Sequence, residues 1–503
     1  MIRRPGLPAL PRHRAGTRRG RWAAALAAAA AVVLAATGCT PQPDERGPEP
    51  AAVPSGLERF YEQKPAWEEC QGSFECASVQ VPLDYAAPEG ESIELAMIRK
   101  RAPMPEGSLL VNPGGPGASG VQLVRNTATT TFSTDLRENF HLVGFDPRGV
   151  GQSAAVECRT DAQLDEGRAG EPMSIAELGE LCDAKNGEIL SHVDTDSAAR
   201  DLDILRAVNG DHDLNYLGFS YGTKLGAAYA DLFPENVGRL VLDGAMDPTL
   251  GISEVTLAQA ESFQQELRAL VEWCGGEASC PLAGGQDGLD ELVQIMDRLE
   301  ADPIPVEDGR EFTEAEFVNA LLLPLYDDGW WQSFSEGLTE LQRQDSAESL
   351  MYMADARSGR LDDGTYADNS WDAFTAINCL DYPDPRVDGA ALDRALDDVS
   401  PTIGWYLGGD LSCDAWPAPP VGDLDPAQPL AGDAQALVIG TTGDPATPYE
   451  WSEALAEQLG PRARLVTYEG HGHTAYGRSN DCITKAVDAF LIDGEVPAEG
   501  LTC

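Results

Sequence analysis

Apolar and polar residues alternate along the first half of the chain in a way that predicts a sheet. Four short apolar runs each end in a glycine-rich or aspartate-containing turn: 108–112, 141–145, 215–219 and 239–243. Between them lie helix-like segments such as Thr195 to Val208, with apolar residues at helical spacing. Strands that alternate with helices indicate a parallel sheet with right-handed crossovers. Upstream, β-type runs at 77–83 and 94–99 predict an antiparallel edge hairpin.

The alternation stops near Pro248 and resumes only at 436–440 and 464–468. The intervening residues have a mostly helical pattern, as in 255–272, 288–300, 314–323 and 330–342. We therefore predict an α/β fold with a mostly parallel central sheet and an inserted helical lid. The predicted parts are the core at 57–250, the lid at 251–430, and the C-terminal part of the core at 431–503.

The N-terminus predicts export. Seven arginines precede an apolar stretch, Trp22 to Ala36, that is shorter than the ~20 residues of a membrane span. Ala36-Thr37-Gly38-Cys39 resembles a bacterial lipobox, with Cys39 as the acylated residue. We expect a signal peptide at 1–38 and a flexible tether at 39–56, leaving an exported lipoprotein or, alternatively, an ordinary secreted protein. A twin-arginine route stays open.

Cysteine count and charge fit that location. Ten of the eleven cysteines follow Cys39, and an even set in an exported chain predicts five disulfides. We expect neighbours in order to pair: Cys70–Cys76, Cys158–Cys182, Cys274–Cys280, Cys379–Cys413 and Cys482–Cys503. The chain beyond residue 38 has 28 basic and 83 acidic residues, a net charge of −55. Such a surface is soluble and repels nucleic acid and anionic substrates.

One stretch, Leu214 to Ala230, predicts a nucleophile. Ser220 lies between Gly218 and Gly222 in Gly-Phe-Ser-Tyr-Gly, after an apolar strand and before a helix that opens with small residues. This is the G-x-S-x-G turn of α/β-hydrolases, in which the glycines allow the sharp bend and the serine oxygen stays accessible.

In that layout the acid and then the histidine follow the serine in the chain. Of six histidines only His471 and His473 come after Ser220, both in a loop that follows the last predicted strand. We prefer His473 as the base. Asp444, which follows the strand at 436–440, is our choice of acid, because it could orient the imidazole.

Asp243 and Asp247 are rival acids at an earlier strand end, where turn capping is the plainer interpretation. Thr447 is either a partner of the acid or a turn residue. For the oxyanion, Asn112-Pro-Gly-Gly-Pro-Gly117 follows the first parallel strand, so we expect backbone N–H donors at Gly115 and Tyr221. The turn at 144–153 is expected to be structural, with Asp146 and Arg148 paired.

These motifs together resemble a known family. Asn-Pro-Gly-Gly-Pro-Gly, Phe-Asp-Pro-Arg-Gly-x-Gly-x-Ser, Gly-x-Ser-Tyr-Gly, Gly-Asp-x-x-Thr-Pro and Gly-His-Thr, in this order, resemble the secreted tripeptidyl aminopeptidases of the α/β-hydrolase superfamily, relatives of the proline iminopeptidases. The resemblance covers about 57–250 and 430–503. It implies triad roles for Ser220, Asp444 and His473. Proline iminopeptidases carry His where Pro113 stands, which favours release of longer N-terminal pieces.

The expected activity is that of an exported serine exopeptidase that releases short peptides, tripeptides by resemblance, from free N-termini. No metal or cofactor is required, and the partners are peptides or proteins with free N-termini. Asp381 is a candidate for binding the substrate's ammonium group, or it is only a loop residue. A carboxylesterase or lipase, with Trp330, Trp331 and Phe334 lining an acyl pocket, a single-residue iminopeptidase, and a non-catalytic lipoprotein are the alternatives.

Overall fold

A computed structural model describes residues 53–169, 173–383, 388–408 and 413–503. The predicted signal peptide, Cys39 and nearly all of the tether therefore lie outside the described residues. No helix in the described ranges is both long enough and apolar enough to cross a membrane.

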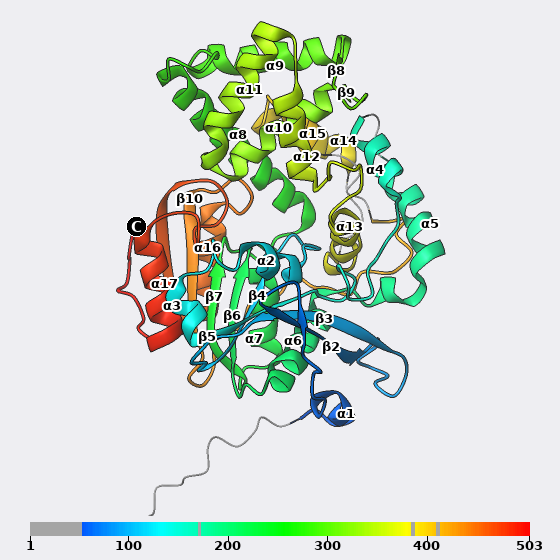
Figure 1. Ribbon diagram of the computed structural model, residues 1–503, viewed down its shortest axis with the longest axis vertical. Helices are drawn as coiled ribbons and strands as arrows, with labels where there is room; N and C mark the ends of the chain where they lie inside the picture. The colour runs from blue at the N-terminus through cyan, green and yellow to red at the C-terminus, as the bar shows by residue number, and fades with distance from the viewer. Residues whose placement is uncertain (1–52, 170–172, 384–387, 409–412) are drawn as a thin grey trace, which may run out of the picture. The chain divides into compact units, whose positions relative to one another are not determined.

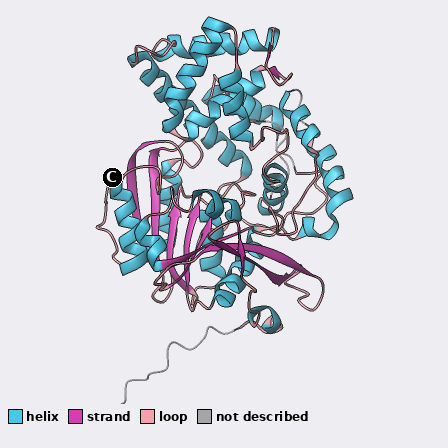
Figure 2. Cartoon of the chain, viewed as in Figure 1, coloured by secondary structure: helices cyan, strands magenta, loops and turns pink. Residues whose placement is uncertain are grey.

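The centre of the protein is a nine-stranded sheet in the order β1-β2-β3-β5-β4-β6-β7-β10-β11 (Figures 1 and 2). The strands are β1 (Glu68–Cys70), β2 (Phe74–Pro82), β3 (Ser92–Lys100), β4 (Gly107–Asn112), β5 (Phe140–Phe145), β6 (Leu214–Phe219), β7 (Val237–Asp243), β10 (Gln435–Gly443) and β11 (Ala463–His471). The first three strands are antiparallel, and β3 joins β5 antiparallel; the six strands from β5 to β11 are parallel. This confirms the predicted mostly parallel sheet and its antiparallel hairpin.

Helices cover both faces of the sheet, because neighbouring strand residues point to opposite sides. In β4, for example, Leu110 packs into one hydrophobic core and Leu109 into another. The first core includes α6 (Thr195–Asn209), α7 (Tyr221–Leu232) and α16 (Tyr449–Leu459), and α1 (Glu58–Tyr61) adds to it. The second includes α2 (Gly120–Thr127), α3 (Thr134–Asn139) and α17 (Asp481–Asp493).

Between β7 and β10 the chain forms a helical insertion, residues 252–407, with its own core. Its elements are α8 (Ile252–Gly276), α9 (Gly285–Ala301), β8 (Ile304–Pro305), β9 (Glu311–Phe312), α10 (Glu314–Tyr326), α11 (Trp331–Gln344), α12 (Glu348–Ser358), α13 (Ser370–Asp381), α14 (Gly389–Val399) and α15 (Gly404–Leu407). Trp331 and Phe334 are buried in this core. They therefore contribute to the packing of the insertion, and Trp330 packs partly buried against the same core. Trp331 also lies against the imidazole of His471, with ring centroids 5.2 Å apart.

The helical insertion has additional partners from the first half of the chain. Between β5 and α6 lie α4 (Asp161–Ala169) and α5 (Ile175–Asn186). On α4, Arg168 forms ion pairs of 2.7 Å with Glu316 and 2.9 Å with Asp355, and Asp165 binds Arg360 at 2.8 Å. The helical layer over the sheet is thus made from two separate segments of the chain, a feature that the periodicity of 251–430 does not reveal.

Five disulfides join the ten described cysteines in the neighbour-to-neighbour order expected from the sequence. Two of them hold segments near the ends of elements: Cys379 on α13 is bonded to Cys413, and Cys482 on α17 to Cys503. The second one fixes the C-terminus beside the sheet, where Cys503 and Thr467 of β11 also share a backbone hydrogen bond of 2.8 Å.

Candidate active site

Ser220 occupies the turn between β6 and α7. Its backbone φ of +56° is one that side-chain-bearing residues rarely adopt. The turn closes because glycines flank it: a Cβ added to Gly218 would stand 2.4 Å from the Gly222 oxygen. The Ser220 N–H donates to the Asp243 carbonyl at 2.9 Å, which ties the turn to the end of β7. The serine is therefore held at the carboxyl edge of the parallel sheet.

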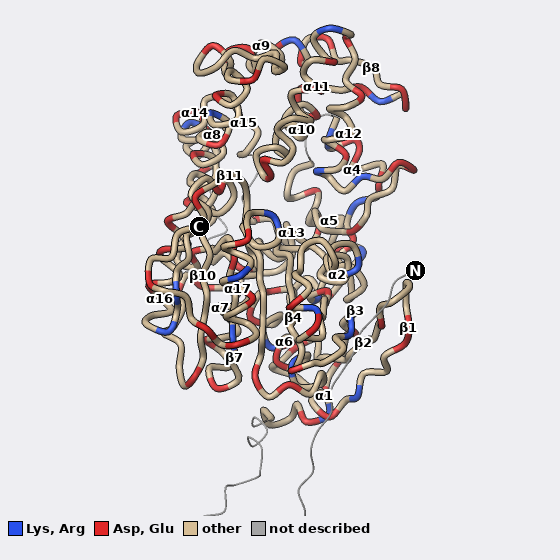
Figure 3. Tube along the Cα trace, turned by 60° about the vertical axis from the view of Figure 1, so that its left-hand side comes forward, with Lys and Arg blue, Asp and Glu red and all other residues tan. Residues whose placement is uncertain are grey.

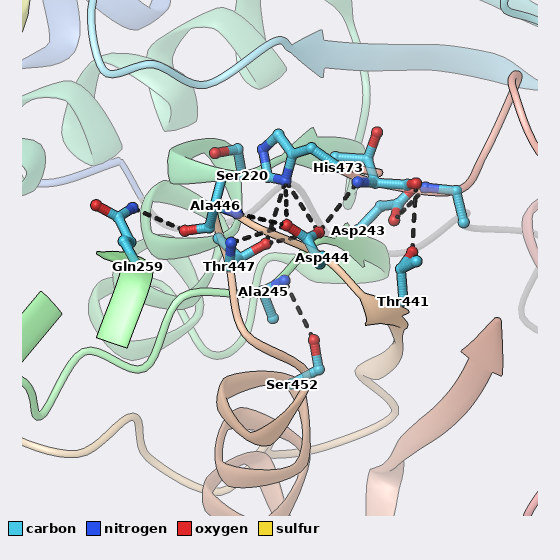
Figure 4. Close-up of polar contacts among 12 residues, drawn as sticks. Ser220, Asp243, Ala245, Gln259, Thr441, Asp444, Ala446, Thr447, Ser452 and His473 are labelled. Carbon is cyan, nitrogen blue, oxygen red and sulfur yellow. Dashed lines mark hydrogen bonds and ion pairs between the residues drawn. The ribbon is translucent and has the colours of Figure 1, made fainter. Parts of the chain in front are cut away.

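Asp444 and His473 meet at the same edge, after β10 and β11, which are the second and third strands along from β6. The Nδ1 atom of His473 lies 2.8 and 2.9 Å from the two carboxylate oxygens of Asp444. A carboxylate on Nδ1 favours a proton there and leaves Nε2 free as an acceptor. Figure 4 shows the Ser220 side chain beside this imidazole, with Asp444 on its other side.

The Asp444 carboxylate is buried and fully hydrogen-bonded. It accepts the backbone N–H groups of Ala446 and Thr447 at 2.9 Å and of Thr474 at 3.1 Å, and the Thr447 hydroxyl at 3.0 Å. Burial alone would raise the pKa of this carboxyl, but the charge and hydrogen bonds of His473 and the backbone donors hold it below its ordinary value. Asp444 therefore stays ionised and can stabilise an imidazolium.

Gly244 allows the end of β7 to lie close to His473 and Thr447. It follows β7 with φ +68°, and a Cβ there would stand 3.3 Å from Cε1 of His473 and 3.0 Å from the Thr447 hydroxyl. On the opposite side, the backbone carbonyl of Tyr326, at the end of α10, accepts the backbone N–H of His473 at 2.7 Å. The rings of these two residues lie edge to face, with centroids 5.5 Å apart. The histidine is thus held by both the sheet and the helical insertion.

The rival acids have other partners. Asp243 accepts the N–H groups of Ala475 at 3.0 Å and Tyr476 at 2.7 Å, directly after the histidine loop. Burial raises the pKa of this carboxyl to about 6 in spite of those bonds. Asp247 accepts from Thr249 and Gln458. Among the described contacts, neither carboxylate is hydrogen-bonded to the imidazole of His473.

The glycine turn after β4 lies against the nucleophile turn. A Cβ on Gly114 would stand 2.4 Å from the Phe219 oxygen and 3.0 Å from the Tyr221 nitrogen, so this contact needs glycine. The Gly114 N–H itself is used, donating to Asn112 Oδ1 at 2.8 Å. Within the described part of the chain, the N–H groups of Gly115 and Tyr221 have no hydrogen-bond acceptor. They are the N–H groups that the sequence predicts as donors to an oxyanion.

Asp381 is buried and already has partners. Its oxygens accept the Thr195 N–H at 2.8 Å and hydroxyl at 2.5 Å, and Lys224 lies 3.3 Å away. This carboxylate therefore caps α6 and is neutralised by a lysine. Its contacts give no support for binding a substrate ammonium group.

The expected Asp146–Arg148 pair is wrong. Arg148 is completely buried and donates to both oxygens of Asp201 at 2.7 Å, while Asp146 accepts from Ser119 and Val121. Residues two apart in a turn point in different directions, so each side chain binds a partner that is distant in the sequence. The predicted structural role of this turn is otherwise consistent with these contacts.

Sequence reasoning missed Glu266 on α8. Its side chain is buried, and Oε2 accepts from Nδ1 of His471 at 3.0 Å, whereas Oε1 is buried with no partner among the described residues. Burial raises the pKa of the Glu266 carboxyl, an effect that His471 partly offsets. The available signal was its position: Glu266 lies on the same helix face as the apolar Phe263, Leu267 and Leu270.

The fold, with a serine, histidine and aspartate at one sheet edge, defines the class of α/β-hydrolase-fold serine hydrolases. A family model described as TAP-like protein matches residues 400–503. Serine protease Hip1 of Mycobacterium tuberculosis is 34% identical over 95% of this chain and 96% of its own length. Carboxylesterase B of the same species is 39% identical, with coverage of 85% and 86%, and the tripeptidyl aminopeptidase of Streptomyces coelicolor is 30% identical, with coverage of 87% and 85%. The chain belongs to the tripeptidyl aminopeptidase-like family of the α/β-hydrolase superfamily.

Proposed function

We propose that this protein is an exported serine exopeptidase that releases short peptides, most simply tripeptides, from the free N-terminus of peptides or proteins. The observation that carries the proposal is the Asp444–His473 pair, with both carboxylate oxygens within 2.9 Å of Nδ1, beside Ser220 at the edge of the sheet. Relatives named serine protease and tripeptidyl aminopeptidase support peptides as substrates.

In the proposed reaction the Ser220 oxygen attacks a peptide carbonyl, and Nε2 of His473 takes the serine proton. Asp444 holds the imidazole in this tautomer and stabilises its positive charge. The N–H groups of Gly115 and Tyr221 hold the developing oxyanion. His473 then returns the proton to the leaving amine, and a water molecule hydrolyses the acyl-enzyme by the reverse sequence.

An exopeptidase also has to recognise a free ammonium group, and Glu266 is our candidate for this role. It is a buried carboxylate of the helical insertion whose Oε1 lacks a partner, and its neighbour His471 is two residues from the base. A buried carboxylate oxygen without a hydrogen bond is costly unless something else binds it. An ammonium group would supply the missing donor.

A carboxylesterase is the second candidate, and the 39% identity to a protein named carboxylesterase B favours it. An ester hydrolase would use Ser220, Asp444 and His473 in the same way but would have no need of Glu266. Release of single residues, as in iminopeptidases, is a further alternative within the exopeptidase class.

One panel of substrates tests these alternatives. We expect chromogenic mono-, di- and tripeptides with a free N-terminus to be cleaved, the tripeptides fastest, and the N-acetylated forms to be poor substrates. Equal turnover of free and acetylated peptides would contradict the exopeptidase proposal, and turnover of simple esters alone would favour the carboxylesterase. Ser220→Ala should abolish turnover and labelling by a fluorophosphonate, which distinguishes this enzyme from a contaminant.

Cell location is a separate part of the proposal. We propose cleavage before Cys39 and acylation of that cysteine, on the strength of the Ala-Thr-Gly-Cys sequence after an apolar stretch. Metabolic labelling with an alkyne fatty acid should mark the wild-type protein and leave Cys39→Ala unlabelled. A labelled Cys39→Ala variant, or an unlabelled wild type found in the culture medium, would favour ordinary secretion.

A further inference from the structure

Arg357, on the last turn of α12, is an arginine of the helical insertion that is paired with no acid among the described residues. Within the described residues it makes no hydrogen bond or ion pair, and its Nε is buried without a partner. Two acids of the same helices of the insertion are paired with other arginines: Asp355 of α12 binds Arg310 at 2.6 Å, and Glu316 of α10 binds Arg168 at 2.7 Å. This is unusual in a chain in which acidic residues far outnumber basic ones (Figure 3).

Two aromatic rings hold the Arg357 guanidinium instead. Its Cζ lies 4.9 Å from the ring centroid of Tyr326 and 5.6 Å from that of Trp371, distances suited to cation–π contacts. Trp371 is fixed in turn by a hydrogen bond of 3.1 Å from its Nε1 to the Ser358 carbonyl. The arginine is therefore pre-positioned by contacts with two rings.

Tyr326 and the helix turn that carries Trp371 contact different parts of the candidate active site. Tyr326 packs edge to face on the imidazole of His473. Trp371 lies in the first turn of α13, and that turn rests on the glycine turn after β4, since a Cβ on Gly117 would stand 2.7 Å from the Ser370 oxygen. The guanidinium thus contacts two rings, one that packs on His473 and one in the helix turn that rests on the glycine turn after β4.

We propose that Arg357 binds a carboxylate of the substrate, on the leaving side of the scissile bond. Arginine presents a planar pair of donors that matches a carboxylate, and its stacked position reduces the entropy lost on binding. The rest of the surface is strongly acidic and repels such substrates, so a local cation is needed to accept one. The carboxylate is either the C-terminus of a short peptide or an acidic side chain just after the cleaved bond.

This inference rests on the proposed peptidase function, and paired substrates separate the two. The first pair is tetra-alanine with a free C-terminus and the same peptide amidated. The second pair is a longer amidated peptide with either Asp or Asn directly after the cleaved bond. Mass spectrometry of the products identifies which bond is cleaved. We expect wild-type kcat/KM to favour the carboxylate member of one pair by about tenfold or more. The pair that shows the preference identifies the source of the carboxylate.

Arg357→Met should abolish this preference, Arg357→Lys should keep part of it, and the matched control Arg343→Met, which removes an exposed arginine of α11, should keep it in full. A preference that persists in Arg357→Met, or none in the wild type, would overturn the proposal. An equal loss for both members of a pair would also overturn it, since it would mean that Arg357 only supports Tyr326.

The rate of fluorophosphonate labelling tests the carboxylate site without any turnover, so it remains informative if the peptidase proposal fails. If the wild type cleaves no free peptide but Ser220 is labelled by a fluorophosphonate, the proposed function fails. In that case tetra-alanine should still slow labelling more than its amide does in the wild type and in Arg343→Met, but not in Arg357→Met. Equal protection by acid and amide in the wild type would reject the carboxylate site as well.

Discussion

Two histidines separated by one glycine each place Nδ1 on a carboxylate, yet the two pairs are built differently. His473 binds Asp444, which comes from the end of a sheet strand, and His471 binds Glu266, which comes from a helix of the insertion. The His473 side chain is 13% exposed and that of His471 is 44% exposed. The same loop therefore connects once to the sheet and once to the helical insertion.

The difference lies in how completely each carboxylate is used. Every oxygen of Asp444 has several donors, and the pKa of this carboxyl is lowered. Glu266 has one bonded oxygen and one without a partner, and burial raises the pKa of its carboxyl. A saturated carboxylate orients its histidine, whereas one with an open oxygen can bind another group. This contrast supports the proposed orienting role of Asp444 and the proposed binding role of Glu266.

The comparison predicts that, of these residues, substitution of Asp444 lowers kcat the most. Asp444→Asn keeps the shape but cannot hold the proton on Nδ1 of His473, so kcat should fall about 10³- to 10⁴-fold. Asp243→Asn is the matched control at the neighbouring strand end; its carboxylate bonds only backbone N–H groups in the described contacts, so kcat should change far less. Steady-state kinetics on a tripeptide substrate measures both. Similar losses in the two variants would remove the distinction between the acids.

A smaller effect is expected at Glu266. Glu266→Gln keeps an oxygen for His471 but loses the charge that would pair with an ammonium group. Hydrogen bonds to charged groups contribute about 1.5–3 kcal/mol, so kcat/KM for free peptides should fall roughly tenfold to a hundredfold. The N-acetylated peptides should be unaffected. A parallel loss for acetylated peptides would indicate that Glu266 only supports the loop.

Thr447 provides one of the hydrogen bonds that saturate the Asp444 carboxylate. Its hydroxyl lies 3.0 Å from Oδ2 of Asp444 and 3.3 Å from Nδ1 of His473. Thr447→Val removes this donor and keeps the volume, so kcat should fall about fivefold, the value of one ordinary hydrogen bond. Thr249→Val, a turn threonine that binds Asp247, serves as the control. An unchanged kcat in Thr447→Val would mean that the hydroxyl only closes the turn.

The fold and the candidate triad followed from the sequence because both depend on local signals. Apolar runs marked the strands, and only His471 and His473 follow Ser220 in the order that the layout requires. The triad roles remain predictions. Arg148, Glu266 and the packing of α4 against the insertion were not accessible in this way, since each depends on a partner 50 or more residues away. The spacing of apolar residues identifies the buried face of an element, but it does not identify which distant side chain packs against that face.

The smallest expected effect is the pH dependence of the Glu266–His471 pair. The hydrogen bond to Glu266 raises the pKa of the His471 imidazole, with Asp328 adding to the shift and Arg478 opposing it. The pKa values of both partners are raised, so the native state binds their protons more tightly than the unfolded chain does. The stability that His471 contributes is therefore complete below its ordinary pKa of about 6.5 and is lost as the pH rises through its higher native value.

The melting temperature of the wild type should consequently exceed that of His471→Gln by about one degree at pH 5.5, and the gap should close by pH 8.5. Thermal melts of both proteins at four pH values measure this difference. His212→Gln removes a partly exposed histidine just before the start of β6, at the opposite end of the parallel strands from the loop at 470–474, and controls for general histidine titration. A gap that stays constant or widens with pH would mean that the pair is neutral, and that the helical insertion is held over the sheet by Tyr326 and packing.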